Sequence, residues 1–326
     1  MSIIAENSNS HLSLEEIERS LQVIDPVFLN TPQFQSDSLS RRLGLELFLK
    51  VETVNPIRSF KGRGAEFLMS DLPDEPHTLV CASAGNFGQG LAYAGRKRGF
   101  CVVVFAAERA NPLKVDRMRQ LGADVQLFGD NFDLAKAEAR RFAESAQARF
   151  IEDGREPQIA EGAGTIAVEL CRSDKQFDAV LVPLGDGALI AGIGHWLKTH
   201  SPTTRIVGVC AAGAPAMAMS WREGRPCSTE TSSTIADGID VRVPVPESLV
   251  NLAGLMDEVL LVEDESLIEA MRLVFNYHGL VIEPAGAAGL AAAIAYKEEF
   301  HGARIATPLC GGNITDDQMR SWLLSC

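Results

Sequence analysis

The sequence predicts an α/β protein built on a parallel, doubly wound sheet. Short apolar segments that end in small residues alternate with helical segments in both halves of the chain. Strands that alternate with helices at this spacing are joined by helical crossovers and lie parallel. The 326 residues are enough for two domains, or for one large α/β unit with an inserted lobe.

Local patterns place the elements of the first half. Ser13 and Glu16 have the spacing of a capping box, which predicts a helix to about residue 21. Residues 45–52 alternate like a strand, and a turn around Lys61 leads into a helix through about residue 70. The elements expected next are a strand at 78–82, a helix to 98, a strand at 100–106, a helix at 112–121, a strand at 123–128 and a helix at 132–146.

The same alternation continues in the second half. The expected strands are 178–183, 205–210, 258–262 and 304–309, and the expected helices end near 198, span 264–277 and begin at 284. Residues 224–247 are rich in Pro, Ser and Thr and predict a long loop. The segment 72–76 contains two prolines and predicts a boundary.

Composition excludes several classes of partner. The net charge of −13, from 43 acidic and 30 basic residues, argues against nucleic acid or an anionic membrane as the main partner. No apolar run reaches the roughly 18 residues that a membrane span needs. The polar residues 1–13 lack the basic and apolar regions of a secretory signal. The seven cysteines are widely spread without a CxxC pair, which predicts reduced thiols in the cytoplasm. The six histidines show no ligand spacing, so no metal site is expected.

The segment 55–65 holds one lysine, Lys61, between Phe60 and two glycines, just after a proline turn. Glycine lets the backbone come close to a ligand. An apolar neighbour removes water from an ammonium group and makes the amine a better nucleophile or Schiff-base former. The segment therefore predicts a reactive lysine, with a basic turn that exposes Lys61 and Arg63 as the alternative.

Small-residue turns follow three predicted strands, at 83–88, 185–189 and 310–313. Ligands of doubly wound sheets bind at the carboxyl ends of the strands, where helix N-termini attract anions. The turn 185–189 is a candidate phosphate cradle, from which we expect the Asp186 carboxylate to point away. The alternatives are a plain strand-to-helix turn and a dinucleotide site, although Ile190 stands where that motif needs Gly or Ala.

The other two turns also have two readings each. Residues 83–86 could hold a substrate carboxylate through backbone N–H groups and the Ser83 hydroxyl, or Ser83 could simply cap a helix. Cys310 ends a buried strand, where most cysteines are inert core residues. Glu283, just before Pro284, is most simply a charge at a helix N-terminus.

Together these motifs resemble a known set. In order they are Ser-Phe-Lys-x-Arg-Gly, Ser-x-Gly-Asn-x-Gly, the Gly-rich loop, Ile-Ala-Asp-Gly, Glu-Pro-x-Gly-Ala and Gly-Gly-Asn. Over about residues 25–320 the chain resembles the pyridoxal-phosphate β-family (fold type II), in its serine/threonine dehydratase and serine racemase branch. The resemblance implies two doubly wound domains of the tryptophan synthase β kind with the active site between them. It implies a large cofactor-binding domain at 1–76 and 156–326 and a small domain at 77–155.

The resemblance also implies roles for single residues. Lys61 would form the Schiff base, Phe60 would pack near the cofactor, and Asn86 would bond its phenolic oxygen. Gly238 would lie by the ring, and Cys310 would face the pyridine nitrogen, where a thiol leaves the ring largely unprotonated and suited to elimination. The expected phosphate loop is Gly185, Asp186, Gly187, Ala188 and Leu189, and the expected substrate contacts are Ser83, Ala84, Gly85, Asn86 and Phe87.

Three departures from the family pattern sharpen this expectation. Ala84 replaces the serine that acts as the opposite-face acid or base in the racemases, and alanine cannot transfer a proton. Residues 210–216 lack the oxygen side chains of the family's divalent-metal site, so no metal is expected. Phe87 replaces a histidine or small residue and makes the expected pocket more apolar.

These observations predict a cytoplasmic ammonia-lyase that uses pyridoxal 5'-phosphate on a β-hydroxy-α-amino acid. L-threonine or L-serine is the default substrate, and phenylserine or a hydroxyectoine-derived diaminobutyrate is the bulkier alternative. An amino-acid racemase, a β-replacement synthase and a nucleotide-binding protein without enzymatic activity are the rival functions. The expected partners are the small substrate and, in a homodimer, a second copy of the chain.

Overall fold

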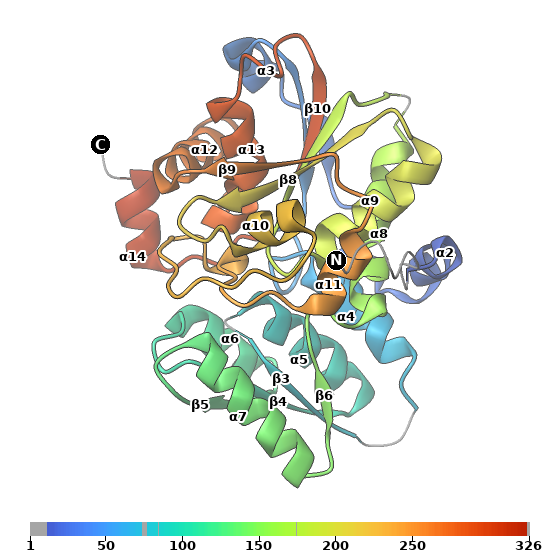
Figure 1. The fold of residues 1–326 in the computed structure, drawn as a ribbon, viewed down its shortest axis with the longest axis vertical. Helices are drawn as coiled ribbons and strands as arrows, with labels where there is room; N and C mark the ends of the chain where they lie inside the picture. Colours follow the sequence, from blue (N-terminus) through green and yellow to red (C-terminus); the bar gives the residue numbers. More distant parts are fainter. Residues whose placement is uncertain (1–11, 74–76, 84, 174, 325–326) are drawn as a thin grey trace.

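The computed structural model of the chain describes residues 12–73, 77–83, 85–173 and 175–324. Its elements form two sheets, one in the upper and one in the lower part of Figure 1. The six-stranded sheet has the order β1-β2-β10-β7-β8-β9, and the four-stranded sheet has the order β5-β4-β3-β6. All pairs are parallel except β1 with β2. The predicted α/β class with parallel sheets is therefore confirmed.

The strands of the large sheet are β1 (Gln33–Gln35), β2 (Glu46–Val51), β7 (Ala179–Pro183), β8 (Arg205–Ala211), β9 (Glu258–Val262) and β10 (Arg304–Leu309). Those of the small sheet are β3 (Thr78–Ala82), β4 (Cys101–Ala106), β5 (Asp124–Leu127) and β6 (Arg149–Ile151). The small sheet thus comes from one continuous stretch of chain, while the large sheet draws strands from both sides of it. The exact domain boundaries at 76/77 and 155/156 stay a prediction.

The helices that cover the sheets are α2 (Leu14–Val23), α3 (Asp37–Leu43), α4 (Lys61–Ser70), α5 (Asn86–Arg98), α6 (Pro112–Gln120), α7 (Phe132–Ser145), α8 (Pro157–Cys171), α9 (Ala188–His200), α10 (Ala216–Glu223), α11 (Pro246–Leu252), α12 (Asp264–His278), α13 (Pro284–Ala295) and α14 (Asp316–Met319). Shorter turns are η1 (Pro26–Phe28), η2 (Asp237–Ile239) and η3 (Arg320–Leu324). The sequence analysis did not predict β1, α3, β6, α8, α10, α11 or α14. The expected loop 224–247 is interrupted by η2 and ends in the first residues of α11.

Three helices next to the large sheet pack through glycines. A Cβ added at Gly64 of α4 would lie 2.5 Å from the Ile159 carbonyl oxygen of α8, and one at Gly192 of α9 would lie 1.9 Å from the Ala160 carbonyl oxygen. Such approaches exclude any side chain at these positions. Close packing therefore fixes the first turns of α4 and α9, which carry Lys61 and the 185–189 turn, relative to α8.

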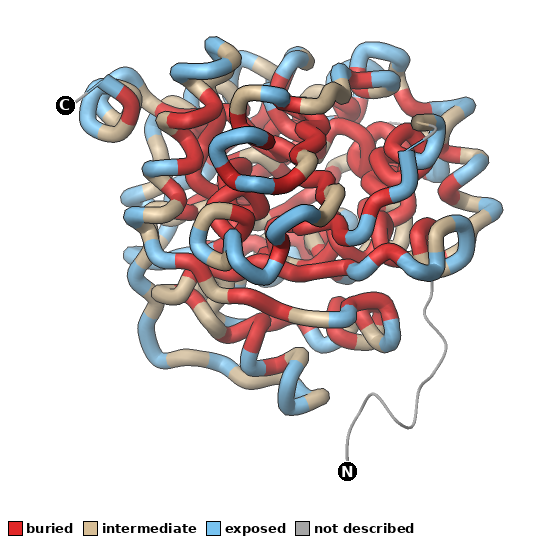
Figure 2. The backbone as a smooth tube through the Cα atoms, turned by 90° about the horizontal axis from the view of Figure 1, so that it is seen from above, coloured by how far each residue is buried: buried red, intermediate tan, exposed pale blue. Residues whose placement is uncertain are grey.

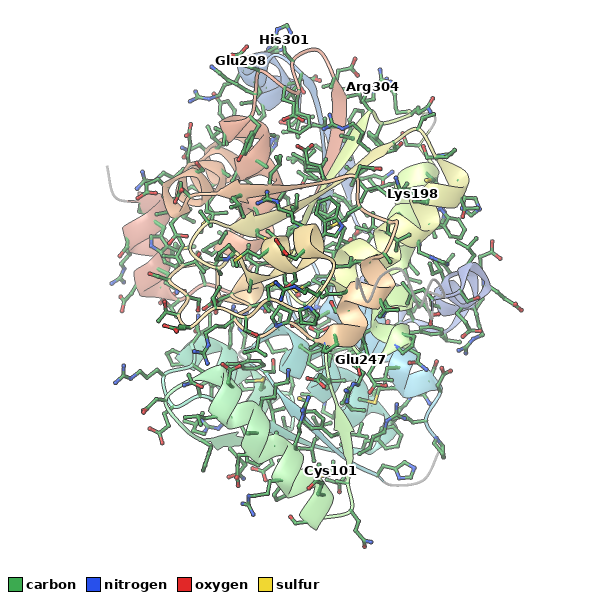
Figure 3. All side chains as sticks on the ribbon, in the orientation of Figure 1. Cys101, Lys198, Glu247, Glu298, His301 and Arg304 are labelled. Atoms are coloured by element: carbon green, nitrogen blue, oxygen red, sulfur yellow. The ribbon has the colours of Figure 1, made fainter. Side chains whose placement is uncertain are left out.

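Buried segments fill the interior of both parts of the molecule, and exposed segments form its outer surface (Figure 2). No helix in the described part of the chain is both long enough and apolar enough to cross a membrane. The six cysteines within the described residues are free thiols, of which Cys101 (labelled in Figure 3) and Cys171 are exposed.

Candidate active site

A cavity of about 500 Å³ is lined by residues from both the small and the large sheet regions. Residues that follow the carboxyl ends of β3, β6, β7 and β10 form its walls. This is the edge at which parallel α/β sheets bind their ligands. Of the residues predicted for the site, those on the cavity wall are Phe60, Lys61, Ser83, Gly85, Asn86, Phe87, Asp186, Gly238 and Cys310.

Lys61 is the first residue of α4, and its amine points into the cavity. Asn55 shapes the preceding turn, because its Oδ1 accepts hydrogen bonds from the backbone N–H groups of Ile57 (3.2 Å) and Ser59 (3.3 Å). The Lys61 Nζ lies 4.9 Å from the centre of the Phe60 ring and 5.8 Å from that of Phe87. The Lys61 side chain is only 15% exposed, so the alternative of an exposed basic turn is wrong.

Asp153, which the sequence analysis missed, is the partner of this amine. Its Oδ2 contacts the Lys61 Nζ, and its Oδ1 is buried without a hydrogen-bond partner. Asp153 follows β6, a three-residue strand with an exposed first residue that gave no alternating pattern. The available signal was an acidic residue just beyond a strand of a parallel sheet.

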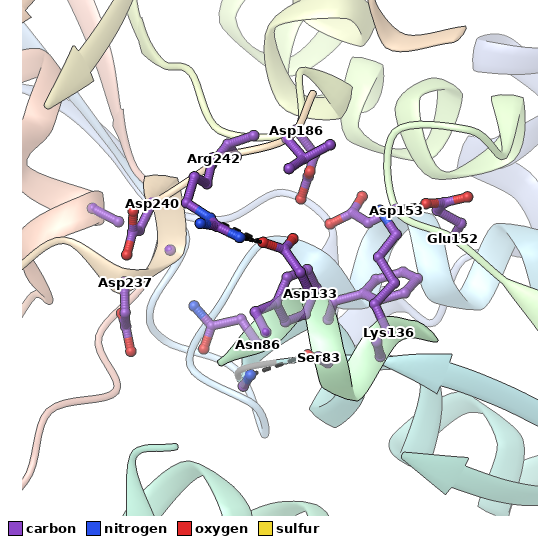
Figure 4. Close-up of a pocket in the computed structure, with 18 of the residues that line it drawn as sticks. Ser83, Asn86, Asp133, Lys136, Glu152, Asp153, Asp186, Asp237, Asp240 and Arg242 are labelled. Carbon is purple, nitrogen blue, oxygen red and sulfur yellow. Dashed lines mark hydrogen bonds and ion pairs between the residues drawn. The ribbon is translucent and has the colours of Figure 1, made fainter. Parts of the chain in front are cut away.

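Asp186 lines the same cavity and faces Asp153 (Figure 4). We expected this carboxylate to point away from an anion held by its turn, but its side chain points into the cavity that Lys61 shares. Burial raises the pKa of Asp186 to about 7, and the nearby charge of Asp153 adds to the shift. The uncharged form is therefore available near neutral pH, and this form does not repel an anion.

The other residues of the 185–189 turn adjoin Asp186 in the chain but do not line the cavity. Gly185, Gly187, Ala188 and Leu189 are not part of the lining that the described residues form. A Cβ at Gly185 would lie 2.9 Å from the Gly238 carbonyl oxygen, and Gly187 has a φ of 95°, which favours glycine. Gly187 precedes α9, and the first N–H groups of a helix have no partner within it. The turn thus offers an anion site beside the cavity.

The turn after β3 supplies Ser83, Gly85, Asn86 and Phe87, while Ala84 lies outside the described residues. The Ser83 Oγ accepts hydrogen bonds from the N–H groups of Gly85 (3.0 Å) and Gly88 (2.9 Å). Ser83 therefore shapes the start of α5. These bonds use its oxygen as an acceptor, and a hydroxyl can also donate.

A polar network backs Asn86 on the opposite wall. Its Nδ2 donates to the Glu283 carboxylate, and its Oδ1 accepts from the Asn313 Nδ2 at 2.8 Å. Lys114 lies 3.1 Å from Glu283 and 2.8 Å from Asp237. Glu283 stands at the N-terminus of α13, as expected, but it is only 1% exposed and its side chain makes no cap bond, so its contacts are with this network and not with the helix. The sequence analysis did not identify Lys114 as a member of this network.

Cys310 and Gly238 line the cavity on the side of α13. The Cys310 Sγ lies 3.8 Å from the Ala285 carbonyl oxygen. Burial, together with the charge of Glu283, raises the pKa of the Cys310 thiol, which therefore stays protonated and neutral. A Cβ at Gly238 would lie 2.8 Å from that of Ala285, so this position admits no side chain without a shift.

An ion pair between Arg242 and Asp133 joins the 224–247 segment to α7 across the cavity (Figure 4). Lys136 of α7 pairs with Glu152, 2.5 Å away. The sequence analysis named none of these four residues. In the described residue ranges, no three His, Cys, Asp or Glu side chains are arranged to hold a metal ion.

Residues 24–311 match the family model described as "Pyridoxal-phosphate dependent enzyme". The chain is 34% identical to the biosynthetic chloroplastic threonine dehydratase of Arabidopsis thaliana over 97% of its own length and 54% of that protein. It is 33% identical to the L-threonine ammonia-lyase of Thermotoga maritima over 93% of its length and 76% of that protein. The structure superposes on maize serine racemase with a TM-score of 0.89 at 26% identity, covering 95% of this chain and 96% of that one. The chain spans only about half the length of the Arabidopsis relative.

The donor set of the cavity fits pyridoxal phosphate. A primary amine, Lys61, lines the cavity near the aromatic rings of Phe60 and Phe87, and α9 begins just after the lining residue Asp186, without a side-chain cap. A neutral thiol and the Asn86 amide face the same space. With a family match over most of its length and a cavity suited to that cofactor, the chain belongs to the pyridoxal-phosphate dependent enzymes of fold type II.

Proposed function

We propose that this enzyme removes water and ammonia from a β-hydroxy-α-amino acid to leave a 2-oxo acid. The observation that carries the proposal is the Lys61 amine, which lines the cavity in contact with a carboxylate and beside a ready anion site. The names of the Arabidopsis and Thermotoga relatives, a threonine dehydratase and an L-threonine ammonia-lyase, support the same reaction.

The residues would divide the work as follows. The first N–H groups of α9 would hold the cofactor phosphate, Asn86 its phenolic oxygen, and the neutral Cys310 thiol its ring nitrogen. When bound, the cofactor draws electron density from the Cα of the amino acid and makes the Cα proton removable. Lys61 would take this proton onto Nζ as the general base, and the Asp153 carboxylate in contact with Nζ would stabilise the ammonium that forms.

L-threonine and L-serine are the default substrates. Phe87 and Phe60 give one wall an aromatic surface, which keeps phenylserine and a hydroxylated diaminobutyrate as bulkier candidates. A racemase is the second candidate, favoured by the likeness to maize serine racemase. It would need a second acid or base besides Lys61, and the sequence has alanine at position 84, where the racemase motif has serine. We further propose that the enzyme works in the cytoplasm and as a homodimer, which a mass measurement in solution would test.

The first experiment tests the lysine. The wild type, loaded with pyridoxal phosphate, should show a visible absorbance band that borohydride reduction removes and fixes to the chain. Lys61→Ala should bind no reducible chromophore, whereas the control Lys198→Ala, on the outer surface (Figure 3), should behave like the wild type. A wild type without a reducible band would remove the assignment of Lys61.

The second experiment tests the reaction. Release of 2-oxo acid is measured from L-serine, L-threonine and phenylserine, and optical rotation is followed in parallel. Release from at least one substrate without racemisation is expected. Racemisation without release would favour the second candidate, and neither reaction would leave a cofactor-binding protein without the proposed activity.

A further inference from the structure

The side of the cavity next to Lys61 carries two carboxylates in succession. The Lys61 Nζ contacts Asp153, and Asp186 faces Asp153 from the start of α9 (Figure 4). The second oxygen of Asp153 is buried and has no hydrogen-bond partner. Gly154 has a φ of 83°, and a Cβ there would lie 2.9 Å from the Asp186 carbonyl oxygen. Backbone packing therefore holds the two acidic residues together.

Four of the other acidic side chains that line this cavity are paired with cations. Asp133 contacts Arg242, Glu152 contacts Lys136, and Glu283 and Asp237 contact Lys114. Contact with a cation favours the deprotonated form of a carboxylate, which makes such a carboxylate a poor proton donor in the resting site. Asp186 differs, because no hydrogen bond to its carboxylate comes from any residue that the structure describes.

Elimination of a β-hydroxyl group needs a proton donor as well as a base. Hydroxide is a poor leaving group, so the Cβ–O bond breaks readily only if the oxygen receives a proton as it leaves. Lys61 cannot supply that proton in the same step, because it is taking one from Cα. The proton must therefore come from a second group that is in its acid form.

We propose that Asp186 is this acid: it protonates the departing β-hydroxyl oxygen, and Asp153 returns the proton from Lys61 to Asp186. The assignment rests on the dehydration proposed above. Asp186 acts as a catalytic residue on the leaving oxygen, and Asp153 is the relay between it and the base.

Protons and electrons balance in this scheme. The Cα–H electron pair becomes the Cα=Cβ bond as the proton goes to the Lys61 Nζ. The Cβ–O pair leaves with the oxygen, which takes the Asp186 proton and departs as water. The ammonium of Lys61 then gives its proton to Asp153, and Asp153 passes it to Asp186, so all three groups return to their starting forms.

The charges around Asp186 suit an acid that works near neutral pH. Asp153 and Glu152 disfavour its ionised form, Lys61 and Lys136 favour it, and burial outweighs both influences and raises its pKa to about 7. Catalytic acids are most effective when their pKa lies near the working pH. The two remaining carboxylates of the described cavity lining, Glu230 and Asp240, lie on the 224–247 segment with Arg242, whereas the ion pair of Lys61 is with Asp153.

The test compares two leaving groups, because chloride departs without a proton. Rates of 2-oxo acid release from L-serine and from β-chloro-L-alanine are measured for the wild type and for Asp186→Asn. The variant should lose about 100-fold or more on L-serine, the usual contribution of a general acid, and less than about threefold on β-chloro-L-alanine. Asp240→Asn, which removes a carboxylate from the same cavity, should leave the ratio of the two rates unchanged.

Equal losses on both substrates, or no loss on L-serine, would overturn the assignment. Cofactor absorbance measured on each variant separates lost cofactor from lost acid catalysis. A wild type that releases 2-oxo acid from β-chloro-L-alanine but from no β-hydroxy amino acid would contradict the proposed dehydration, and the role of Asp186 with it.

A second measurement needs no variant. The wild-type kcat for L-serine should fall as the pH rises through the pKa of Asp186, because the acid form disappears, and kcat for β-chloro-L-alanine should lack this fall. The same descending limb for both substrates would overturn the proposal, because it would belong to a group that acts before the leaving group departs.

Discussion

Lys61 and Arg63 stand two residues apart on the first turn of α4, but they differ in burial and in the number of their partners. Arg63 is fully buried, and its guanidinium lies 2.8 Å from Glu52 and 2.7 Å from Glu169. Thr165 accepts a further bond at 2.8 Å, and Lys50 also contacts Glu169. Lys61 instead meets one carboxylate, which has an unpartnered oxygen, at the edge of an open cavity.

The contrast separates the charges that hold the fold from those that do chemistry. Every polar atom of the Arg63 guanidinium has a partner, which is the condition under which burying charges can be tolerated. At Asp186, burial and then the nearby charge of Asp153 raise the pKa of the carboxyl, and strongly perturbed pKa values are concentrated at functional sites. The first cluster anchors the helix that presents the second.

The largest expected effect is that of Lys61→Ala on turnover. Without the amine neither cofactor attachment nor removal of the Cα proton is possible, so kcat/KM should fall by at least about 10⁴-fold. The free energy of unfolding should change by only about 1 kcal/mol, because the side chain packs at the cavity edge. Steady-state kinetics and urea unfolding on the same preparations check both statements. A stability loss as large as the activity loss would erase the distinction between the two clusters.

Arg63→Met should have the reverse profile. It leaves Glu52 and Glu169 buried with too little positive charge, and breaking a buried pair in this way costs about 3–5 kcal/mol. The matched control is Arg205→Met, which also removes an arginine that touches two carboxylates, Glu258 and Glu299, but at 45% exposure. That loss should stay below about 1 kcal/mol. Equal losses in urea unfolding would mean that burial of the Arg63 cluster contributes nothing.

Glu169→Gln tests the same cluster from the acidic side. Burial works to raise the pKa of Glu169, but Arg63 and Lys50 outweigh it and hold that pKa below its ordinary value of 4.5. The ion pairs therefore contribute stability that is present above pH 4.5 and is lost as the pH falls through the lower folded-state pKa. The variant should be about 2–3 kcal/mol less stable at pH 7.

The same variant has a pH signature. Its deficit relative to the wild type should shrink below pH 4.5, where the wild-type carboxylate is also becoming neutral. Urea midpoints measured from pH 7 down to pH 4 check the trend. A deficit that does not depend on pH would show that Glu169 acts through its shape and not its charge.

Periodic sequence patterns predicted most of the fold, since the strands of both sheets apart from β1 and β6 were expected within a residue or two at each end. Helix α8 was not predicted, because its glycines lower its helix propensity. The close approach of α8 to α4 and α9 nevertheless requires these glycines. Tertiary packing stabilises that helix, and tertiary packing has no local sequence pattern. The short strand β6 escaped for a similar reason, and Asp153 was missed with it.

The site was predictable where a residue type carries its own chemistry. Lys61, Asn86 and Cys310 stand on the cavity wall as expected. The direction in which each side chain points, and the side chain with which it pairs, were not predictable, because both depend on segments that are distant in the chain. The partner of Lys61 is 92 residues away, and that of Asn86 is 197 residues away.

The smallest predicted effect on stability is that of Asp186→Asn. Like Glu169→Gln, it replaces an acid by its amide, but it should raise the free energy of unfolding and not lower it. The folded state raises the pKa of Asp186 from 3.8 to about 7, so the folded protein loses stability relative to the unfolded chain as the pH rises between these values. An uncharged amide avoids that cost. The variant should therefore be about 1 kcal/mol more stable than the wild type at pH 8, with the gain vanishing near pH 4. Urea unfolding of both proteins at the two pH values measures the difference, and a destabilised variant at pH 8 would mean that the Asp186 carboxylate has a stabilising cationic partner after all.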